Sequence, residues 1–238
     1  MFLFGKNTAF EDLDFVILAS QRTGSNMLVS LLDVYPDVRC HGELFRKQRV
    51  AKKGALKILN ELPEAYEDGS YRDANFSEYL RLVRELSTPE TFFGFKLMLN
   101  QALEARKAII RKSKSKIILL YRENLLSIYS SNLIAKSTGQ GNARNGSEIK
   151  TEKVEFEEDR FTRFCENHLR NYEEARRDIK EFASGRFLEI SYLQICSAQG
   201  MSEIEAFLGV VSPPNPVATI GGPHSRAPAG LDPRSPGR

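Results

Sequence analysis

The hydrophobic positions of the chain change between unbroken runs and helical spacing, and this alternation predicts its secondary structure. Four mostly apolar runs have the length and composition of buried strands: Phe15–Ala19, Phe93–Leu97, Lys116–Tyr121 and Phe187–Ile190. Helical spacing is clearest in three other segments: Asn75–Leu86, Asn100–Lys112 and Glu158–Ala183. Strands that alternate with helices are typical of an α/β fold with a central parallel sheet and right-handed crossovers.

The junction after the first predicted strand has the layout of a loop that binds phosphate. The strand Phe15–Ala19 leads into a turn at Gln21–Asn26 that holds Arg22 and Gly24, and a helical pattern begins at Met27. A helix start offers unpaired N–H groups and a partial positive charge to an anion. An arginine adds a fork of donors that matches phosphate or sulfate oxygens. We therefore expect an anion here, and the alternative is an ordinary strand-to-helix connection.

Two common nucleotide-binding loops are excluded by the residues of this turn. The loop of nucleoside triphosphatases reads G-x-x-x-x-G-K-[ST], and the dinucleotide-binding turn reads G-x-G-x-x-G. The turn at Gln21–Asn26 contains a single glycine and has no lysine before its hydroxyl residues. It therefore suits an anionic group smaller than a magnesium-bound triphosphate.

A second predicted strand also ends in an arginine and runs directly into a helix. Arg122 follows the strand Lys116–Tyr121, Asn124 is a suitable N-cap, and Ser130 lies about two turns into the helix. Ligands of open α/β sheets bind at the carboxyl ends of the strands, so this junction indicates a second anion contact. Taken singly, Arg122 and Ser130 would be ordinary surface residues.

Together, these motifs resemble those of sulfotransferases that use 3′-phosphoadenosine 5′-phosphosulfate (PAPS). Ser20–Leu28 is similar to their 5′-phosphosulfate loop, and its R-T-G-S core is most similar to the bacterial carbohydrate sulfotransferases of the trehalose and Nod-factor type. The resemblance implies a three-layer, P-loop-like α/β fold with a central parallel sheet flanked by helices. It also implies that five residues bind the 5′ end of PAPS: Arg22, Thr23, Gly24, Ser25 and Asn26.

The resemblance extends to a second cofactor contact and to a candidate base. An arginine and a serine eight residues apart hold the 3′-phosphate in this family, which implies that role for Arg122 and Ser130. Cys40–Phe45 resembles a family segment, H-G-E-x-F, whose glutamate is placed as general base, which implies that role for Glu43. Lys96 matches a lysine near the end of the family's next core strand. The alternative for Glu43 is an acid in a solvated loop, and the alternative for Lys96 is a lysine that faces solvent at a strand end.

The resemblance covers roughly Phe15–Val210 and has two departures. Ser191–Gln194 lacks the glutamate of the family's Y-E-x-L segment, and residues 212–238 hold seven of the ten prolines where the family has further ordered chain. We therefore expect a sulfotransferase-like α/β domain at 1–211 and a disordered Pro/Gly-rich tail at 212–238. Lys136–Lys150 is expected to be a loop, either a mobile lid or a loop that binds the acceptor.

Composition narrows the classes of partner and cofactor. A chain of 238 residues, 41% hydrophobic and 27% charged, can bury one sizeable core, and a formal charge of +3 does not favour nucleic acid as a partner. Cys40, Cys165 and Cys196 are too scattered for a disulfide framework or a zinc site, so no metal is expected. We expect no integral membrane segment and no signal peptide, and hence a cytoplasmic protein, because the apolar stretches are too short.

The sequence therefore predicts a sulfotransferase that moves a sulfuryl group from PAPS to a hydroxyl of a carbohydrate or glycolipid, in line and without a metal. Arg22, Glu43 and Lys96 are its candidate catalytic residues. One alternative is a catalytically impaired nucleotide-binding protein of the same fold, which would explain the unusual tail and the missing glutamate after Tyr192. A P-loop kinase is the other alternative, and the missing Gly-Lys pair argues against it.

Overall fold

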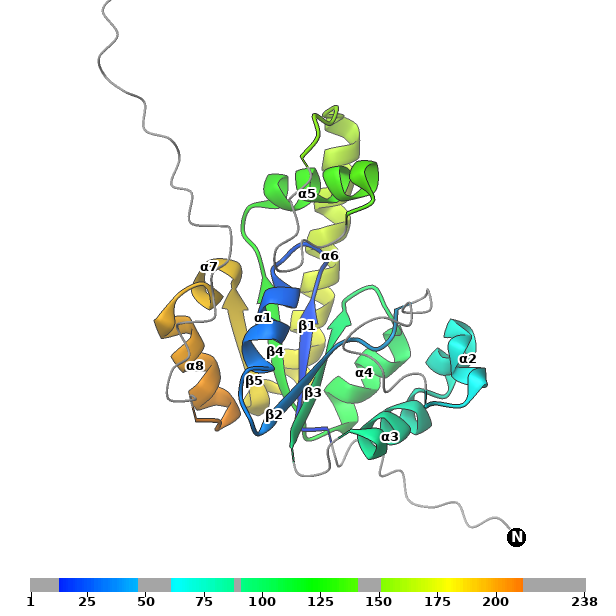
Figure 1. Cartoon of the computed structure of the whole chain (residues 1–238). Coiled ribbons are helices and arrows are strands. Elements are labelled where there is room, and N and C mark those ends of the chain that lie inside the picture. The colour runs from blue at the N-terminus through cyan, green and yellow to red at the C-terminus, as the bar shows by residue number, and fades with distance from the viewer. Residues whose placement is uncertain (1–12, 47–60, 88–90, 141–150, 212–238) are drawn as a thin grey trace, which may run out of the picture.

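The computed structural model describes residues 13–46, 61–87, 91–140 and 151–211 (Figure 1). Within these ranges, strands form one sheet in the order β2-β3-β1-β4-β5, and every neighbouring pair is parallel. The strands are β1 (Phe15–Ala19), β2 (Val38–Glu43), β3 (Phe92–Met98), β4 (Lys116–Tyr121) and β5 (Phe187–Ser191). The predicted central parallel sheet is confirmed, and the four predicted strands are observed with ends shifted by at most one residue.

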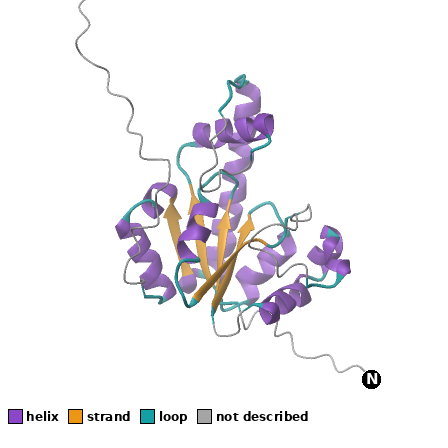
Figure 2. Cartoon of the chain, viewed as in Figure 1, coloured by secondary structure: helices purple, strands orange, loops and turns teal. Residues whose placement is uncertain are grey.

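Helices make up most of the remaining described chain (Figure 2). The α-helices are α1 (Ser25–Leu32), α2 (Gly69–Ala74), α3 (Phe76–Leu86), α4 (Leu103–Lys112), α5 (Leu125–Thr138), α6 (Glu158–Phe182), α7 (Tyr192–Ile195) and α8 (Ala198–Leu208). Short 3₁₀ helices occur at Glu64–Glu67 and Ser184–Arg186. The predicted cap of α5 is confirmed, because the side chain of Asn124 accepts a hydrogen bond from the backbone N–H of Ser127.

The helices cover both faces of the sheet and give the molecule three layers. On one face, α3 and α4 contribute buried side chains such as Tyr79 and Ile109. On the other face, α1 and α8 contribute Leu28 and Ile204. All five residues of β1, the central strand, are buried, which explains why its sequence is an unbroken apolar run. The predicted three-layer α/β architecture is therefore confirmed.

The strand order places a topological switch point at the carboxyl ends of β1 and β4. The chain leaves β1 through α1 toward β2 on one side, and it leaves β4 through α5 and α6 toward β5 on the other. Adjacent strands whose connections diverge in this way mark the place where open α/β sheets bind ligands. Figure 1 shows α5 across this end of the sheet and the long α6 running along the sheet to meet it. Both predicted anion-binding loops begin at this switch point.

β2 does not occur among the strands that were predicted. It lies at the edge of the sheet, and its sequence V-R-C-H-G-E alternates apolar with polar residues and contains a glycine. An edge strand is covered less completely than the central strands, so it does not need their continuous apolar run. The segment with the candidate base is thus a strand and not a loop.

The largest differences from the predicted helix ends occur in α4 and α5. α4 begins at Leu103, three residues later than predicted, because Ala102 has a positive φ of 37° and breaks the helical path. α5 continues to Thr138, into the segment predicted to be a loop, and ends where Gly139 adopts the left-handed conformation.

The other predictions about flexible segments concern residues 141–150 and 212–238, which lie outside the described residues. The lid at 136–150 and the disordered tail therefore stay predictions. Among the helices that the structure describes, none is long and apolar enough to cross a membrane.

Candidate active site

The loop between β1 and α1 forms a tight turn at the start of a helix. Arg22 and Gly24 both have left-handed backbone conformations, with φ of 65° and 88°. The hydroxyl of Thr23 donates to the carbonyl of Ser20 at 2.8 Å, which fixes the shape of the turn. α1 begins at Ser25, and the preceding N-cap residue, Gly24, has no side chain to cap the helix. This helix start can therefore receive an anion from outside the chain.

Gly24 also leaves room for an aromatic side chain from α7. A Cβ atom at Gly24 would lie 2.4 Å from Cδ2 of Tyr192, so a larger residue would force a shift. The guanidinium carbon of Arg122 lies 4.5 Å from the centre of the same ring, in cation–π geometry. Tyr192 therefore connects the predicted 5′ loop with the arginine predicted to bind the 3′-phosphate. The sequence pattern gave no signal for this contact.

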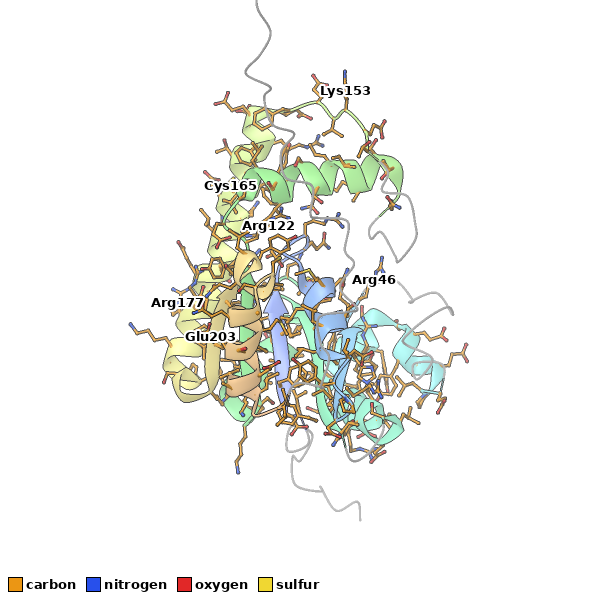
Figure 3. All side chains as sticks on the ribbon, turned by 60° about the vertical axis from the view of Figure 1, so that its left-hand side comes forward. Arg46, Arg122, Lys153, Cys165, Arg177 and Glu203 are labelled. Atoms are coloured by element: carbon orange, nitrogen blue, oxygen red, sulfur yellow. The ribbon has the colours of Figure 1, made fainter. Side chains whose placement is uncertain are left out.

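The two predicted anion-binding arginines are neighbours. Nη1 of Arg122 donates to the backbone carbonyl of Arg22 at 3.3 Å, and Figure 3 shows Arg122 beneath α5 at the end of the sheet. Burial, and then the positive charge of Arg122, lower the pKa of Arg22 below its usual range. The two guanidinium groups therefore repel each other. An anion bound beside them would offset this repulsion, and the fork of each guanidinium suits phosphate or sulfate oxygens.

α5 brings a serine to this site, one position beyond the predicted one. Nε of Arg22 donates to Oγ of Ser131 at 2.8 Å. Ser130, predicted to bind the 3′-phosphate, donates to the carbonyl of Ser127 within its own helix at 3.3 Å. Consecutive helical residues point about 100° apart, so the two hydroxyls face different surroundings. The contact of Ser131 with the Arg22 loop was not predicted, because two serines stand side by side and the spacing selected only one.

The candidate base Glu43 and the candidate catalytic Lys96 form an ion pair at the ends of β2 and β3. Nζ of Lys96 lies 3.3 Å from Oε1 of Glu43. The side-chain amide of Gln101 donates to Oε2 of Glu43 at 3.1 Å, so both carboxylate oxygens have a donor. Lys96 is only 1% exposed, and its alternative interpretation as a solvent-facing lysine is wrong.

A β-bulge at Gly42 brings this pair together. The register of β2 with β3 pairs His41 with Phe95, and then Glu43 with Lys96, so β2 has one extra residue. Side chains of a regular strand alternate between the two faces, and without the extra residue Glu43 would point to the face opposite Lys96. The glycine of the H-G-E segment therefore lies where the strand is re-aimed.

Lys96 also connects this ion pair to the phosphate loop. Its ammonium group donates to Oδ1 of Asn26 in the first turn of α1. Burial lowers the pKa of Lys96, and the charge of Glu43 opposes this shift without cancelling it. One desolvated cation thus contacts both the predicted base and a residue predicted to bind the 5′ end of PAPS.

The histidines around this site are packed into the fold. Nε2 of His41 lies 3.0 Å from Oγ of Ser87, and burial lowers the pKa of His41 to about 4. His168 packs between the rings of Phe164 and Tyr172. In the parts of the chain that the structure describes, no group of three or more His, Cys, Asp or Glu could hold a metal ion.

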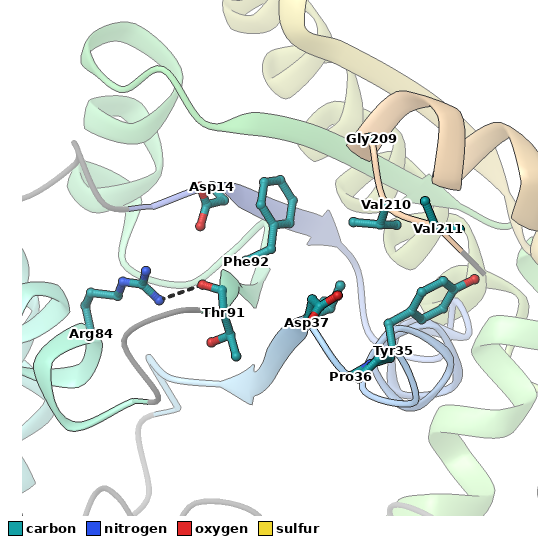
Figure 4. Close-up of a pocket in the computed structure, with 11 residues that line it drawn as sticks. Asp14, Tyr35, Pro36, Asp37, Arg84, Thr91, Phe92, Gly209, Val210 and Val211 are labelled. Atoms are coloured by element: carbon teal, nitrogen blue, oxygen red, sulfur yellow. Dashed lines mark hydrogen bonds between the residues drawn. The ribbon is translucent and has the colours of Figure 1, made fainter. Parts of the chain in front are cut away.

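A cavity of about 450 Å³ lies at the opposite end of the strands (Figure 4). Its lining includes Asp14 and Phe92, at the amino ends of β1 and β3, and Val210, which follows α8. Arg84 lies at its side and donates to the carbonyl of Thr91 at 2.9 Å. The predicted site residues do not line this cavity, so it is separate from the carboxyl-end site.

Comparisons with known proteins place the chain in a family and find solved structures similar to it. The sequence model described as the sulfotransferase family matches residues 14–213. Among solved structures, the sulfotransferase domain from the curacin biosynthetic pathway has a TM-score of 0.52 and 16% identity, over 84% of this chain and 75% of that chain. The mouse sulfotransferase SULT7A1 complexed with PAP has a TM-score of 0.43 and 14% identity, over 88% of this chain and 65% of that chain. No curated protein matches the chain significantly.

The likeness to the curacin pathway domain extends over most of this chain and confirms the predicted P-loop-like fold. The family match runs from just before β1 to beyond α8, so it includes both arginine loops and the Glu43–Lys96 pair. The chain therefore belongs to the sulfotransferase family.

Proposed function

We propose that the chain binds PAPS at the carboxyl ends of β1 and β4 and transfers its sulfuryl group to a hydroxyl of a carbohydrate or glycolipid. In this proposal, residues 22–26 bind the 5′-phosphosulfate, and Arg122 and Ser130 bind the 3′-phosphate, with Ser131 beside them. The observation that carries the proposal is the position of Lys96, whose ammonium contacts both Asn26 and Glu43. A sulfuryl group held at the loop would lie next to the candidate base.

The charges around the loop support a ligand with more than one anionic group. Arg122 is close enough to Arg22 to lower its pKa, and Lys96 adds a third cation at the same end of the sheet. Each hydrogen bond from such a group to an anion contributes about 1.5–3 kcal/mol. The N–H groups at the start of α1 add donors that carry no net charge.

The chemistry follows from where these side chains lie. Glu43 would accept the proton of the acceptor hydroxyl while the hydroxyl oxygen bonds to sulfur and the bond between sulfur and the 5′-phosphate oxygen breaks. Arg22 and Lys96 would stabilise negative charge on the transferred group and on the leaving phosphate. Sulfuryl transfer needs position and charge stabilisation more than covalent help from the protein, and cationic side chains supply both here, so the proposed mechanism uses no metal.

The acceptor class rests on the motifs around the site. The R-T-G-S loop and the H-G-E-x-F segment resemble those of carbohydrate sulfotransferases, and the bulge places the glutamate of that segment beside Lys96. Membership of the sulfotransferase family sets the kinase alternative aside. A protein of this fold that binds the nucleotide but no longer transfers sulfate is the remaining alternative, and the experiment below separates it from an active enzyme.

The test combines transfer of radiolabelled sulfate from PAPS with calorimetric binding of the product, 3′-phosphoadenosine 5′-phosphate. Glycans and glycolipids form the acceptor panel, and simple phenols serve as the comparison class. Glu43→Gln should lower turnover by about 10²–10⁴ while the product still binds. Arg122→Ala should weaken product binding by about tenfold or more, since it removes charge-assisted bonds. Arg39→Ala removes an exposed arginine paired with Asp33 and is the matched control.

Each result decides one part of the proposal. Near-normal turnover in Glu43→Gln would refute the assignment of the base. Unchanged product affinity in Arg122→Ala would refute the second phosphate contact. Product binding with no transfer to any acceptor would favour the catalytically impaired alternative, and transfer to phenols alone would refute the carbohydrate class.

A further inference from the structure

A buried tyrosine of α6 joins the two loops that the proposed function assigns to the nucleotide. The hydroxyl of Tyr172 accepts a hydrogen bond from the backbone N–H of Ser20 at 3.1 Å and donates to the carbonyl of Leu120 at 2.7 Å. Ser20 is the first residue after β1 and starts the loop of Arg22. Leu120 lies in β4, two residues before Arg122. One hydroxyl thus connects the origins of both loops.

This hydroxyl lies where the two strands separate. β1 and β4 pair up to Ala19 and Leu120, and β1 then turns away into its loop. The Tyr172 hydroxyl lies between the N–H of Ser20 and the carbonyl of Leu120 and bonds to both. It takes the place of a direct backbone hydrogen bond and holds the strand ends at a fixed separation.

The ring that carries the hydroxyl has little freedom to move. Tyr172 is 2% exposed. The ring of His168 lies 4.9 Å from it, and the guanidinium carbon of Arg176 lies 5.6 Å from its centre. Burial raises the pKa of Tyr172, so the hydroxyl keeps the proton that it donates to Leu120. α6 therefore presents a rigid two-sided hydrogen-bonding group to the strand ends.

We propose that Tyr172 is a positioning residue that sets the spacing between the two anion-binding loops, so that one bisphosphorylated nucleotide reaches both. This inference rests on the proposed function, in which the Arg22 loop and Arg122 bind opposite ends of that nucleotide. Two linked contacts strengthen each other only when the distance between their sites matches the ligand. A ligand with one phosphate engages one loop and does not depend on this distance.

The test measures binding of three probes to the wild-type protein and to Tyr172→Phe by calorimetry. The probes are 3′-phosphoadenosine 5′-phosphate, adenosine 5′-phosphate and adenosine 3′-phosphate. Tyr172→Phe removes one oxygen atom and with it the hydrogen bonds to Ser20 and Leu120. Affinity for the bisphosphate should fall by about tenfold or more, because its two phosphate contacts no longer strengthen each other. Affinity for each single phosphate should change by less than about twofold.

The matched control is Tyr79→Phe. Tyr79 is 1% exposed, and its hydroxyl donates to the backbone carbonyl of Leu44 at 2.8 Å, so the substitution removes the same group from an equally buried setting. It lies on α3, and its hydroxyl bonds to the segment that follows β2 and not to Ser20 or Leu120. Tyr79→Phe should lower the melting temperature about as much as Tyr172→Phe and leave the affinity for all three probes unchanged.

The outcomes separate this inference from the proposed function. If the wild-type protein binds the bisphosphate no more tightly than the single phosphates, the proposed function fails. Suppose that the wild-type protein binds the bisphosphate more tightly than either single phosphate. The positioning role is then refuted if Tyr172→Phe keeps this difference, or if it weakens the binding of all three probes equally. A measurement on the wild-type protein gives an independent check. The amide of Ser20, which lies outside the sheet ladder, should exchange its hydrogen slowly, and exchange at the rate of an open loop would overturn the inference.

Discussion

The ion pair between Glu43 and Lys96 predicts an asymmetry that can be measured as stability. The Lys96 side chain is 2% exposed and the Glu43 side chain is 23% exposed, although their charged atoms lie 3.3 Å apart. Removing the charge of either partner breaks the same contact. The two losses should nevertheless differ, because the carboxylate left behind can reach water and the ammonium left behind cannot.

The expected sizes follow from these surroundings. Glu43→Gln leaves a desolvated ammonium with only neutral oxygen partners, one of them on Asn26, and should cost about 2 kcal/mol of unfolding free energy, within the range for a charge-assisted hydrogen bond. Lys96→Met removes an ion that burial already disfavours, and Gln101 still holds the carboxylate. This change should cost about 1 kcal/mol or less. The double variant should be more stable than Glu43→Gln alone, because it no longer buries an unpaired charge.

The assay is urea unfolding of the wild type, both single variants and the double variant, from pH 7 to pH 9.5. Burial keeps the pKa of Lys96 in the folded protein below its usual 10.5. Between the pKa of Lys96 in the folded protein and 10.5, the unfolded state therefore binds more protons than the folded state. Stability rises with pH in this window. Loss of the opposing Glu43 charge lowers the pKa of Lys96 further and widens the window downward, so the deficit of Glu43→Gln should shrink as pH rises.

Three results would refute this reasoning. Lys96→Met could prove more damaging than Glu43→Gln, which would mean that the carboxylate is the less hydrated partner. The two single losses could add up in the double variant, which would mean that the side chains do not interact. A deficit of Glu43→Gln that stays constant with pH would show that Lys96 is not the group left unpaired.

Two further predictions concern stability. Gly24→Ala should lower the free energy of unfolding by about 2 kcal/mol or more, because Gly24 has a positive φ and an added Cβ would clash with Tyr192. Gly139→Ala should cost about 1 kcal/mol, because Gly139 also has a positive φ but an added Cβ would meet no atom within 4 Å. Equal losses of stability in urea unfolding would contradict the role of the Tyr192 contact. Burial lowers the pKa of His41 to about 4 from its usual 6.5, so the unfolded state binds more protons between these values and stability should fall by up to about 3 kcal/mol as pH falls through them. His41→Asn should remove about 1.4 kcal/mol per pH unit from this slope in urea unfolding measured from pH 6.5 down to pH 4, and an unchanged slope would count against the burial argument.

The parts of the fold that were predictable are those specified by local patterns. β1 is buried on both faces and therefore shows as an apolar run, and the residues from Arg22 onward are a strand-to-helix turn that can be recognised without its surroundings. β4 and the Asn124 cap of α5 are recognisable for the same reason. These are the segments in which the backbone conformation depends mainly on neighbours in the sequence.

The unpredicted parts depend on contacts between distant segments. β2 is recognisable as a strand only once it is placed at the edge of the sheet, and its bulge appears only in the register with β3. The proximity of Arg22 to Arg122 and the contact of Tyr192 with Gly24 each join segments about a hundred residues or more apart. Loop geometry, and not spacing along the chain, decides that Ser131 contacts Arg22.

Features that oppose folding gather at the carboxyl end of this sheet. Of the residues described, two that are not glycine have a positive φ, namely Arg22 and Ala102, and Ala102 follows the residue that holds the candidate base. Each such conformation costs about 1–2 kcal/mol. Arg22 also faces the like charge of Arg122, and Lys96 is an ammonium that burial destabilises. The apolar layers elsewhere can sustain these costs, and an anion bound beside the two arginines would offset the repulsion between them. Backbone strain and like charges concentrated at the carboxyl end of the sheet therefore favour the binding of an anion, as the motifs predict.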